Sequence, residues 1–185
     1  MTFYVYVDNS NVWIEGMRIS AVRKGLAKST TDAMNRKITD HDWSYDFGKL
    51  YELICPPDQM IGRSSLFGSR PPANDSIWNL ARAHGFEVFL FDRNAANKEK
   101  QVDVAISTQI MEDSFQHMKD GDRLLLVSGD RDYLPTIESL RNRGFPARVA
   151  FWEHATGNEL KQAPIDYIPL DPAFDYITRT SEVDE

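Results

Sequence analysis

Four aspartates of this 185-residue chain stand where carboxylates could hold a cation. Asp8 ends the first hydrophobic run, Asp130 follows a later run, and Asp132 comes two residues after it. Asp103 falls near the start of a stretch with helical spacing. Acids gathered in one cleft repel each other unless a cation lies between them. Mg²⁺ and Mn²⁺ prefer such oxygen ligands, and ions held in this way activate water for phosphodiester hydrolysis.

The neighbours of these acids add polar groups and also an alternative explanation. Asn11 follows Asp8 by three residues, and Ser128 precedes Asp130 by two, so each could orient a water or contact a phosphate. Asp and Asn are also favoured helix N-caps, and turns from strand to helix are where caps occur. Asp8, Asp103 or Asp132 taken singly is more often a cap than a ligand, whereas the set of four favours a site.

The elements that must position these acids alternate between strands and helices. Short apolar runs, rich in β-branched and aromatic residues, suit strands buried on both faces of a parallel sheet. Their alternation with helical stretches predicts an α/β fold with right-handed crossovers. If the first and fourth strands are neighbours, Asp8 faces Asp130 at the carboxyl ends of the strands, where ligands bind in such sheets. The predicted strands are 3–7, 61–67, 86–91, 124–127 and 147–151 with a short one near 167–170, and the predicted helices are 46–54, 75–84, 102–118, 133–143 and 158–162.

The composition is that of one soluble globular domain, with 42% hydrophobic and 26% charged residues. The net charge of −7 argues against nucleic-acid binding through bulk positive charge. The charge is uneven, because Gly16–Lys37 has six basic residues against one acid, whereas residues 171–185 have five acids against one arginine. We predict a domain over residues 1–170 and a frayed acidic tail over residues 171–185.

Several classes of protein are disfavoured by what the sequence lacks. A single cysteine excludes a disulfide framework, and the four histidines have no zinc-ligand spacing. No nucleotide-binding P-loop motif and no serine-hydrolase elbow motif occur. The N-terminus does not read as a signal peptide, and no apolar run is long enough to span a bilayer, so we expect a cytoplasmic protein.

Three motifs together resemble the NYN domain, a branch of the PIN-like nuclease group, and bacterial stand-alone NYN proteins of the LabA type. They are Asp8-x-x-Asn11, Lys100-x-x-Asp103-Val104 and Ser128-Gly129-Asp130-x-Asp132-Tyr133, in matching order over residues 2–170. The resemblance implies a PIN-like three-layer α/β/α sandwich with a central, mostly parallel sheet. It also implies an endoribonuclease that depends on Mg²⁺ or Mn²⁺. A homodimer is compatible with this family.

The resemblance also assigns roles to individual residues. It makes Asp8, Asp103, Asp130 and Asp132 the catalytic, metal-holding acids and makes Asn11 and Ser128 their supporting polar residues. Many relatives carry a further acid six residues beyond the position of Asp103, and here that residue is Gln109. This departure could weaken a second metal position.

We expect the substrate to be single-stranded or structured RNA, and basic or aromatic residues near the acids are candidate contacts. Solvated charge explains the basic residues about equally well, and aromatic residues beside strands are more often core. The basic segment Gly16–Lys37 is a candidate for a second contact surface. The predicted RNA contacts are Trp13, Arg63, Arg70, Arg93, Lys98, Lys100 and Arg131.

Two other functions compete with this one. A phosphatase of the haloacid-dehalogenase type needs a second aspartate two residues after the first, and Ser10 occupies that position. A catalytically weak or inactive RNA-binding or regulatory protein is the stronger alternative, because Gln109 replaces an acid. RNA binding without metal-stimulated cleavage would select it.

Overall fold

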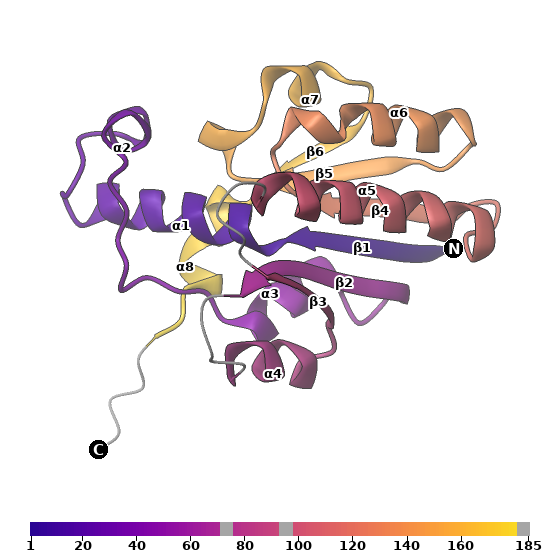
Figure 1. The fold of residues 1–185 in the computed structure, drawn as a ribbon, viewed down its shortest axis with the longest axis horizontal. Coiled ribbons are helices and arrows are strands. Elements are labelled where there is room, and N and C mark those ends of the chain that lie inside the picture. The colour runs from indigo at the N-terminus through magenta and orange to yellow at the C-terminus, as the bar shows by residue number, and fades with distance from the viewer. Residues whose placement is uncertain (71–75, 93–97, 181–185) are drawn as a thin grey trace.

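A single six-stranded parallel sheet forms the centre of the computed structural model, which describes residues 1–70, 76–92 and 98–180 (Figure 1). The strand order is β3-β2-β1-β4-β5-β6, so the first and fourth strands are neighbours, which is the condition for Asp8 to face Asp130. The strands are β1 (Thr2–Asp8), β2 (Met60–Arg70), β3 (Glu87–Asp92), β4 (Arg123–Val127), β5 (Ala147–Phe151) and β6 (Asp166–Pro169).

Helices cover both faces of this sheet, which makes three layers (Figure 1). One face carries α1, α3, α4 and α8, and the other carries α5, α6 and α7. None of the helices in the described ranges is long and apolar enough to cross a membrane. The helices are α1 (Asn9–Arg23), α2 (Thr30–Arg36), α3 (Phe47–Ile54), α4 (Ser76–Ala83), α5 (Lys98–Gln116), α6 (Leu134–Asn142), α7 (Asn158–Gln162) and α8 (Phe174–Ile177), with 3₁₀ turns η1 (Arg131–Tyr133), η2 (Glu153–Ala155) and η3 (Asp171–Ala173).

Strand β1 lies in the middle of the sheet and is buried on both faces. Val5 and Val7 enter the core beneath α1 and α3, whereas Tyr4 and Tyr6 enter the core beneath α5 and α6. A strand of this kind must be apolar at every position, which is why it reads as a continuous hydrophobic run. The predicted three-layer α/β/α sandwich with a parallel sheet is confirmed.

The order of connections reverses between β1 and β4. From β1 the chain builds β2 and β3 on one side and then returns to place β4 on the other side of β1. Val7 pairs with Val127, so Asp8 and the residues after Val127 emerge next to each other at the carboxyl edge. In open α/β sheets this reversal opens the crevice in which ligands bind.

Helix α1 begins at Asn9, directly after the first strand, and is longer than its sequence pattern indicates. Its buried side contains small and polar residues such as Gly16, Ser20 and Ala21, so the sequence has no apolar stripe that would predict a helix here. A Cβ atom at Gly16 would lie 2.1 Å from the ring of Trp43, which packs directly on the helix backbone. The Trp43 ring thus packs on the backbone of α1, where other buried helices present apolar side chains.

The prediction of a frayed acidic tail is wrong for residues 171–180. Phe174 and Ile177 of α8 are buried in the core of the α1 and α3 layer. The backbone N–H of Asp46 donates to the carbonyl oxygen of Ile177 at 2.8 Å, and that of Arg179 donates to Ser44 at 2.9 Å. Two apolar residues and backbone pairing hold this segment despite its acidic composition, and residues 181–185 lie outside the described ranges.

Candidate active site

Asp8 is the most deeply buried of the predicted site acids, with 2% of its surface exposed. It ends β1 and caps α1, because its Oδ1 accepts the backbone N–H of Asn11 at 3.2 Å. The side-chain amide of Asn11 donates to Asp8 Oδ2 at 2.6 Å. Asp8 is therefore both a helix cap and a carboxylate fixed at the crevice. Burial raises its pKa, the Asn11 hydrogen bonds oppose that rise, and the negative charge of Asp130 adds to it.

The turn after β4 brings a second pair of acids to the same edge. Ser128 is fully buried, and its Oγ accepts the Asn11 side-chain amide at 3.4 Å and the backbone N–H of Asp130 at 3.3 Å. Asp130 caps η1 by accepting the N–H of Asp132 at 2.9 Å. Ser128 thus links the turn after β1 to the turn after β4.

Asp103 reaches the crevice from another layer, because it lies on α5 and not at the end of a strand. The hydroxyl of Tyr133 lies between it and Asp8, 2.9 Å from Asp103 Oδ1 and 3.3 Å from Asp8 Oδ2. Tyr133 is fully buried at the end of η1. Three segments far apart in the sequence therefore meet at one tyrosine hydroxyl.

The carboxylates of this site act on one another electrostatically. Burial and the negative charges of Asp8, Asp130 and Asp132 raise the pKa of Asp103 to about 6, against the hydrogen bond from Tyr133. Burial and the charges of Asp8 and Asp103 also raise the pKa of Tyr133. Among the side chains that the structure describes, no lysine or arginine forms an ion pair with these four acids. The site thus concentrates negative charge without a cationic partner from the described chain.

These residues fit a divalent cation in their donor chemistry. Carboxylate oxygens are the ligands of Mg²⁺ and Mn²⁺, and a positive charge would relieve the repulsion that raises the Asp103 pKa. Within the described ranges, no three His, Cys, Asp or Glu side chains converge closely enough to hold a metal ion. The Tyr133 hydroxyl lies between two of the acids, Asp8 and Asp103.

The loop after β5 fixes α1 at the edge of the site. The indole N–H of Trp152 donates to the carbonyl oxygen of Val12 at 3.0 Å. His154 Nε2 lies 3.0 Å from Glu15 Oε2, and Arg18 pairs with the other carboxylate oxygen of Glu15. Gly129 packs here as well, because a Cβ on it would lie 2.3 Å from the Phe151 ring. A glycine is therefore needed at position 129, because a side chain there would collide with the Phe151 ring.

The predicted RNA contacts differ in where they lie and in whether the structure describes their side chains. Arg131 is exposed beside the acids and pairs with Glu159 at 3.1 Å. Trp13 packs against Tyr45 with ring centroids 5.1 Å apart, so its ring already has a protein partner. The side chains of Arg70, Lys98 and Lys100, and all of Arg93, lie outside the described residues.

Arg63 is not brought to the site. It pairs in register with Tyr4, near the opposite end of β2 from the crevice. Its guanidinium forms ion pairs with the buried carboxylate of Asp113 and with Glu87, each at 3.2 Å. Gln109 belongs to the same network, because its amide donates to Asp113 at 3.3 Å. These two side chains serve a buried network away from the four acids.

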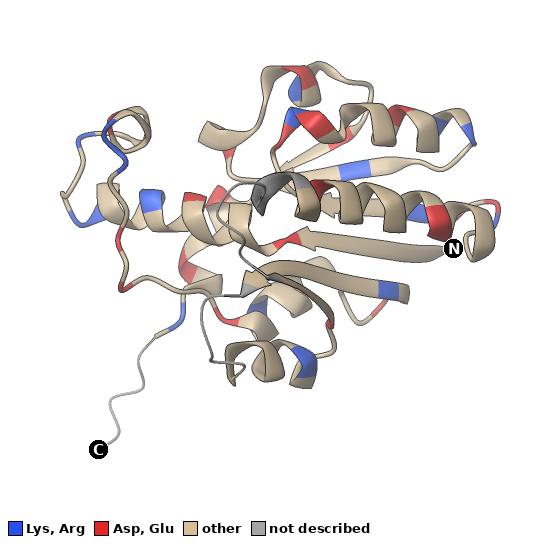
Figure 2. Cartoon of the chain, viewed as in Figure 1, with Lys and Arg blue, Asp and Glu red and all other residues tan. Residues whose placement is uncertain are grey.

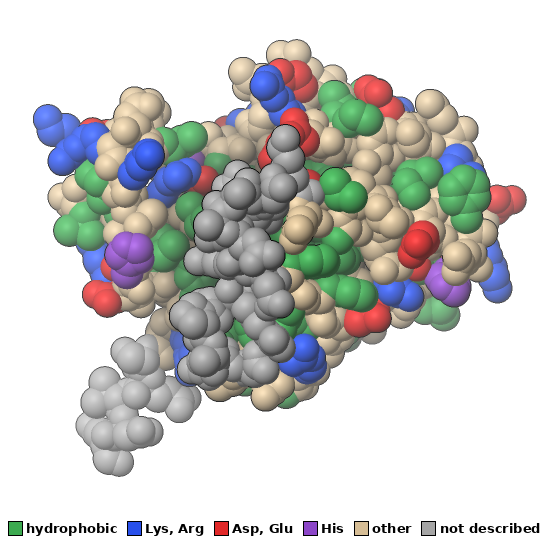
Figure 3. Space-filling view, in the orientation of Figure 1, with side chains coloured by type: hydrophobic (Ala, Val, Ile, Leu, Met, Phe, Trp, Pro, Cys, Tyr) green, Lys and Arg blue, Asp and Glu red, His purple; other side chains and the backbone are tan. Residues whose placement is uncertain are grey.

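A basic arm, residues 24–37, extends beyond the carboxyl edge of the sheet. Figure 2 shows Lys and Arg around α2, and Figure 3 shows their side chains gathered at that end of the molecule. Lys24 is 2.8 Å from the buried Asp40, and Arg36 is 3.2 Å from Asp32. For Lys28 and Lys37, no ion pair forms with any described side chain. The arm therefore presents exposed cations at a distance from the acids.

Comparison with known proteins agrees with the fold. The α/β/α layers around one parallel sheet are those of a PIN-like fold. The family description "NYN domain" matches residues 3–171, so the chain belongs to the NYN domain family. Proteins of this family are generally nucleases, and PIN-like nucleases generally use divalent metals.

One solved structure is similar over nearly the whole chain. It is the crystal structure of a protein of unknown function, VPA0982, from Vibrio parahaemolyticus, with a TM-score of 0.68 and 17% sequence identity. The match covers 96% of each chain, and at this identity it shows the fold alone. No curated protein matches.

Sequence reasoning named the acids but missed the role of Tyr133. The residue stands at the end of the third motif, and its aromatic character is explained equally well by core packing. Only the fold brings its hydroxyl to Asp8, which is 125 positions away in the chain. His154 was likewise not recognised as the partner of Glu15, because 139 positions separate them.

Proposed function

We propose that this protein is a metal-dependent endoribonuclease that hydrolyses RNA phosphodiester bonds at the carboxylates of the β1–β4 crevice. The observation that carries the proposal is the position of Asp8 and Asp130 beside the reversal of strand order, with Asp103 joined to Asp8 through the Tyr133 hydroxyl. Membership of the NYN family supports the choice of nuclease chemistry.

The residues of the chain have separate tasks in this proposal. Asp8, Asp103, Asp130 and Asp132 would hold Mg²⁺ or Mn²⁺. When bound, the cation supplies activated water and stabilises the charge that develops on phosphate and on the leaving oxygen. Asn11 fixes the Asp8 carboxylate through two hydrogen bonds.

RNA would approach from the open side of the crevice. Arg131, exposed beside Asp130 and Asp132 and paired with Glu159, would contact a phosphate near the scissile bond. The basic arm would contact the same strand further along, because α1 extends outward from the crevice by about 22 Å, at 1.5 Å for each of its 15 residues. A chain with a net charge of −7 needs such local cations to attract a polyanion.

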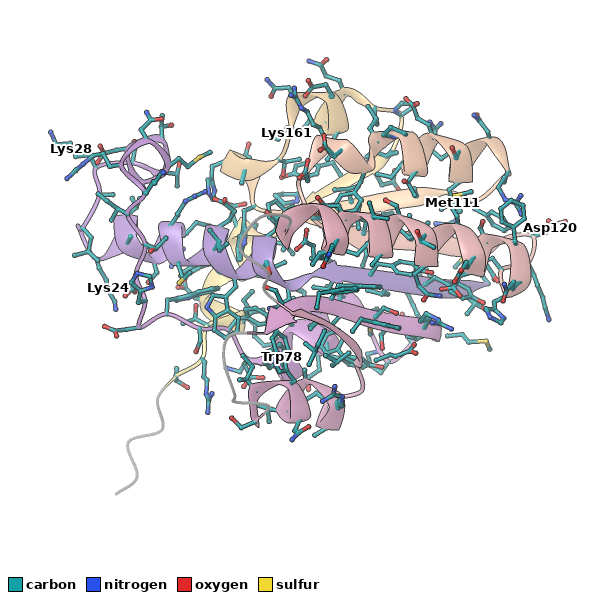
Figure 4. All side chains as sticks on the ribbon, viewed as in Figure 1. Lys24, Lys28, Trp78, Met111, Asp120 and Lys161 are labelled. Atoms are coloured by element: carbon teal, nitrogen blue, oxygen red, sulfur yellow. The ribbon has the colours of Figure 1, made fainter. Side chains whose placement is uncertain are left out.

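The test is cleavage of a labelled RNA with Mn²⁺, Mg²⁺ or EDTA, using Asp8→Asn and Asp130→Asn. Both variants should slow cleavage at least about 100-fold, because a carboxylate-held cation supplies several kcal/mol of transition-state stabilisation. Asp120→Asn is the matched control, since Asp120 is exposed at the far end of the molecule (Figure 4). Equal rates for the parent and both site variants would show that the site is wrongly assigned.

A second function is favoured by one specific observation. Gln109 stands where many relatives carry an acid, and its amide is engaged with the buried Asp113. An RNA-binding protein with little catalytic activity is therefore the alternative. It predicts tight RNA binding in EDTA, which filter binding measures, and no cleavage on addition of Mn²⁺, which the cleavage assay measures.

A further inference from the structure

The acids of the crevice differ in which hydrogen-bond donors hold their carboxylates in place. Asp8 accepts two hydrogen bonds from Asn11, one on each oxygen. Asp130 accepts the N–H of Asp132 within its own turn. These donors lie within three residues of the acids that they orient, so the local backbone fixes both carboxylates.

Asp103 has no such local donor among the described residues. It stands on α5, in the layer that covers the sheet, and the strand ladder does not set its distance from Asp8. The hydrogen bond that the described structure gives its carboxylate comes from the Tyr133 hydroxyl at 2.9 Å. Because the same hydroxyl lies 3.3 Å from Asp8 Oδ2, it also links the two acids.

The position of that hydroxyl is itself firmly determined. Tyr133 is fully buried, and its ring belongs to the core cluster that includes Val102 and Ile106 of α5. It ends η1, whose first turn is capped by Asp130.

We propose that Tyr133 is a positioning residue that aligns the Asp103 carboxylate with Asp8 for binding a divalent cation. The inference rests on the proposed function, because it needs a cation site at these acids. Groups that orient the ligands of a metal typically change its affinity by about 10- to 100-fold when they are removed. The hydroxyl of Tyr133 meets that description for Asp103.

The chain provides a closely matched control. Tyr6 is fully buried and donates its hydroxyl to the buried Asp113 at 2.6 Å. Asp113 is paired with Arg63 and takes no part in the crevice. Tyr6→Phe therefore removes the same chemical group and the same kind of hydrogen bond at a position that is remote from the proposed cation.

The experiment measures Mn²⁺ affinity by calorimetry, and melting temperature in EDTA, for the parent, Tyr133→Phe, Tyr6→Phe and Asp8→Asn. Phenylalanine keeps the buried ring, so both tyrosine variants should fold. Tyr133→Phe should raise the Mn²⁺ dissociation constant by about 10- to 100-fold. Tyr6→Phe should lower the melting temperature and leave that dissociation constant unchanged.

The outcomes separate the inference from the function on which it rests. If Asp8→Asn abolishes Mn²⁺ binding but Tyr133→Phe binds as tightly as the parent, Tyr133 is only a core residue and the inference is overturned. Tighter binding by Tyr133→Phe would overturn it too, because the hydroxyl would then compete with the cation. If Asp8→Asn binds Mn²⁺ like the parent, the assigned cation site fails and the inference fails with it.

Discussion

At the scale of single residues, helix capping and the proposed cation site involve the same carboxylates. Asp8 and Asp130 are N-caps of α1 and η1, as their positions after strands predict. The same two carboxylates border the crevice at the strand reversal. A cap fixes its side chain against backbone N–H groups, which is also how a ligand carboxylate is held in place. Capping by these residues is therefore compatible with the ligand role that we propose for them.

The raised pKa of Asp103 predicts how the cation-free protein responds to pH. The folded protein binds this proton more tightly than the unfolded chain does, with a pKa of about 6 against an ordinary value of 3.8. Stability from this group is thus greatest at low pH and is lost as pH rises through about 6. In EDTA, Asp103→Asn should become increasingly more stable than the parent between pH 5 and pH 7.5. Melting temperatures measured across that range check this, and a difference that does not vary with pH would refute it.

At the scale of elements, the sequence predicts those with a regular apolar pattern. The central strands and helices α3, α4, α5 and α6 were all expected from runs and periodicity, with ends that shift by a few residues. Helix α1 is not among the predicted helices, because its buried side uses Gly16, Ser20 and Ala21. Helix α8 was missed because its two core residues, Phe174 and Ile177, lie in an acidic segment.

The residues of the site likewise divide into those that a sequence pattern predicts and those that it does not. Asp8, Asn11, Ser128 and Asp130 were predictable because strand ends carry them to one edge. Contacts between layers were not predictable, because no local pattern specifies which hydroxyl of one layer meets which carboxylate of another. The contact of Tyr133 with Asp103 is the clearest case.

The close packing on α1 gives a prediction that opposes helix propensity. Gly→Ala in a helix ordinarily stabilises by about 0.5–1 kcal/mol. Here the new Cβ of Gly16→Ala would lie 2.1 Å from the Trp43 ring, so we expect a loss of about 1–3 kcal/mol. Denaturant unfolding measures it. The double variant with Trp43→Phe should recover part of the loss, and a stabilised Gly16→Ala would contradict the packing.

At the scale of the whole molecule, the position of the charges matters more than their sum. The net charge of −7 contains the four acids of the crevice, whereas exposed cations gather on the arm formed by residues 24–37. Several cations of the arm are paired locally, as Lys24 is with Asp40 and Arg36 with Asp32. Lys28 and Lys37 are therefore the residues through which the arm would contact RNA.

This distribution predicts the salt dependence of RNA binding. Removing two phosphate contacts with Lys28→Gln and Lys37→Gln should reduce the slope of log affinity against log salt by about 1.4 for single strands or about 1.8 for duplexes. Filter binding in EDTA measures the slope without cleavage. Lys119→Gln with Arg82→Gln removes two exposed cations away from the arm and serves as the control. Equal slopes for both double variants would remove the arm from the RNA interface.

The most direct measurement of the central proposal is a crystal structure of the protein soaked in Mn²⁺, with anomalous diffraction to locate the ion. The proposed function predicts a Mn²⁺ peak in the crevice between β1 and β4, about 2.1 Å from oxygens of Asp8 and of at least one of Asp103 and Asp130. An empty crevice with separated carboxylates, at Mn²⁺ concentrations that support RNA cleavage, would contradict it.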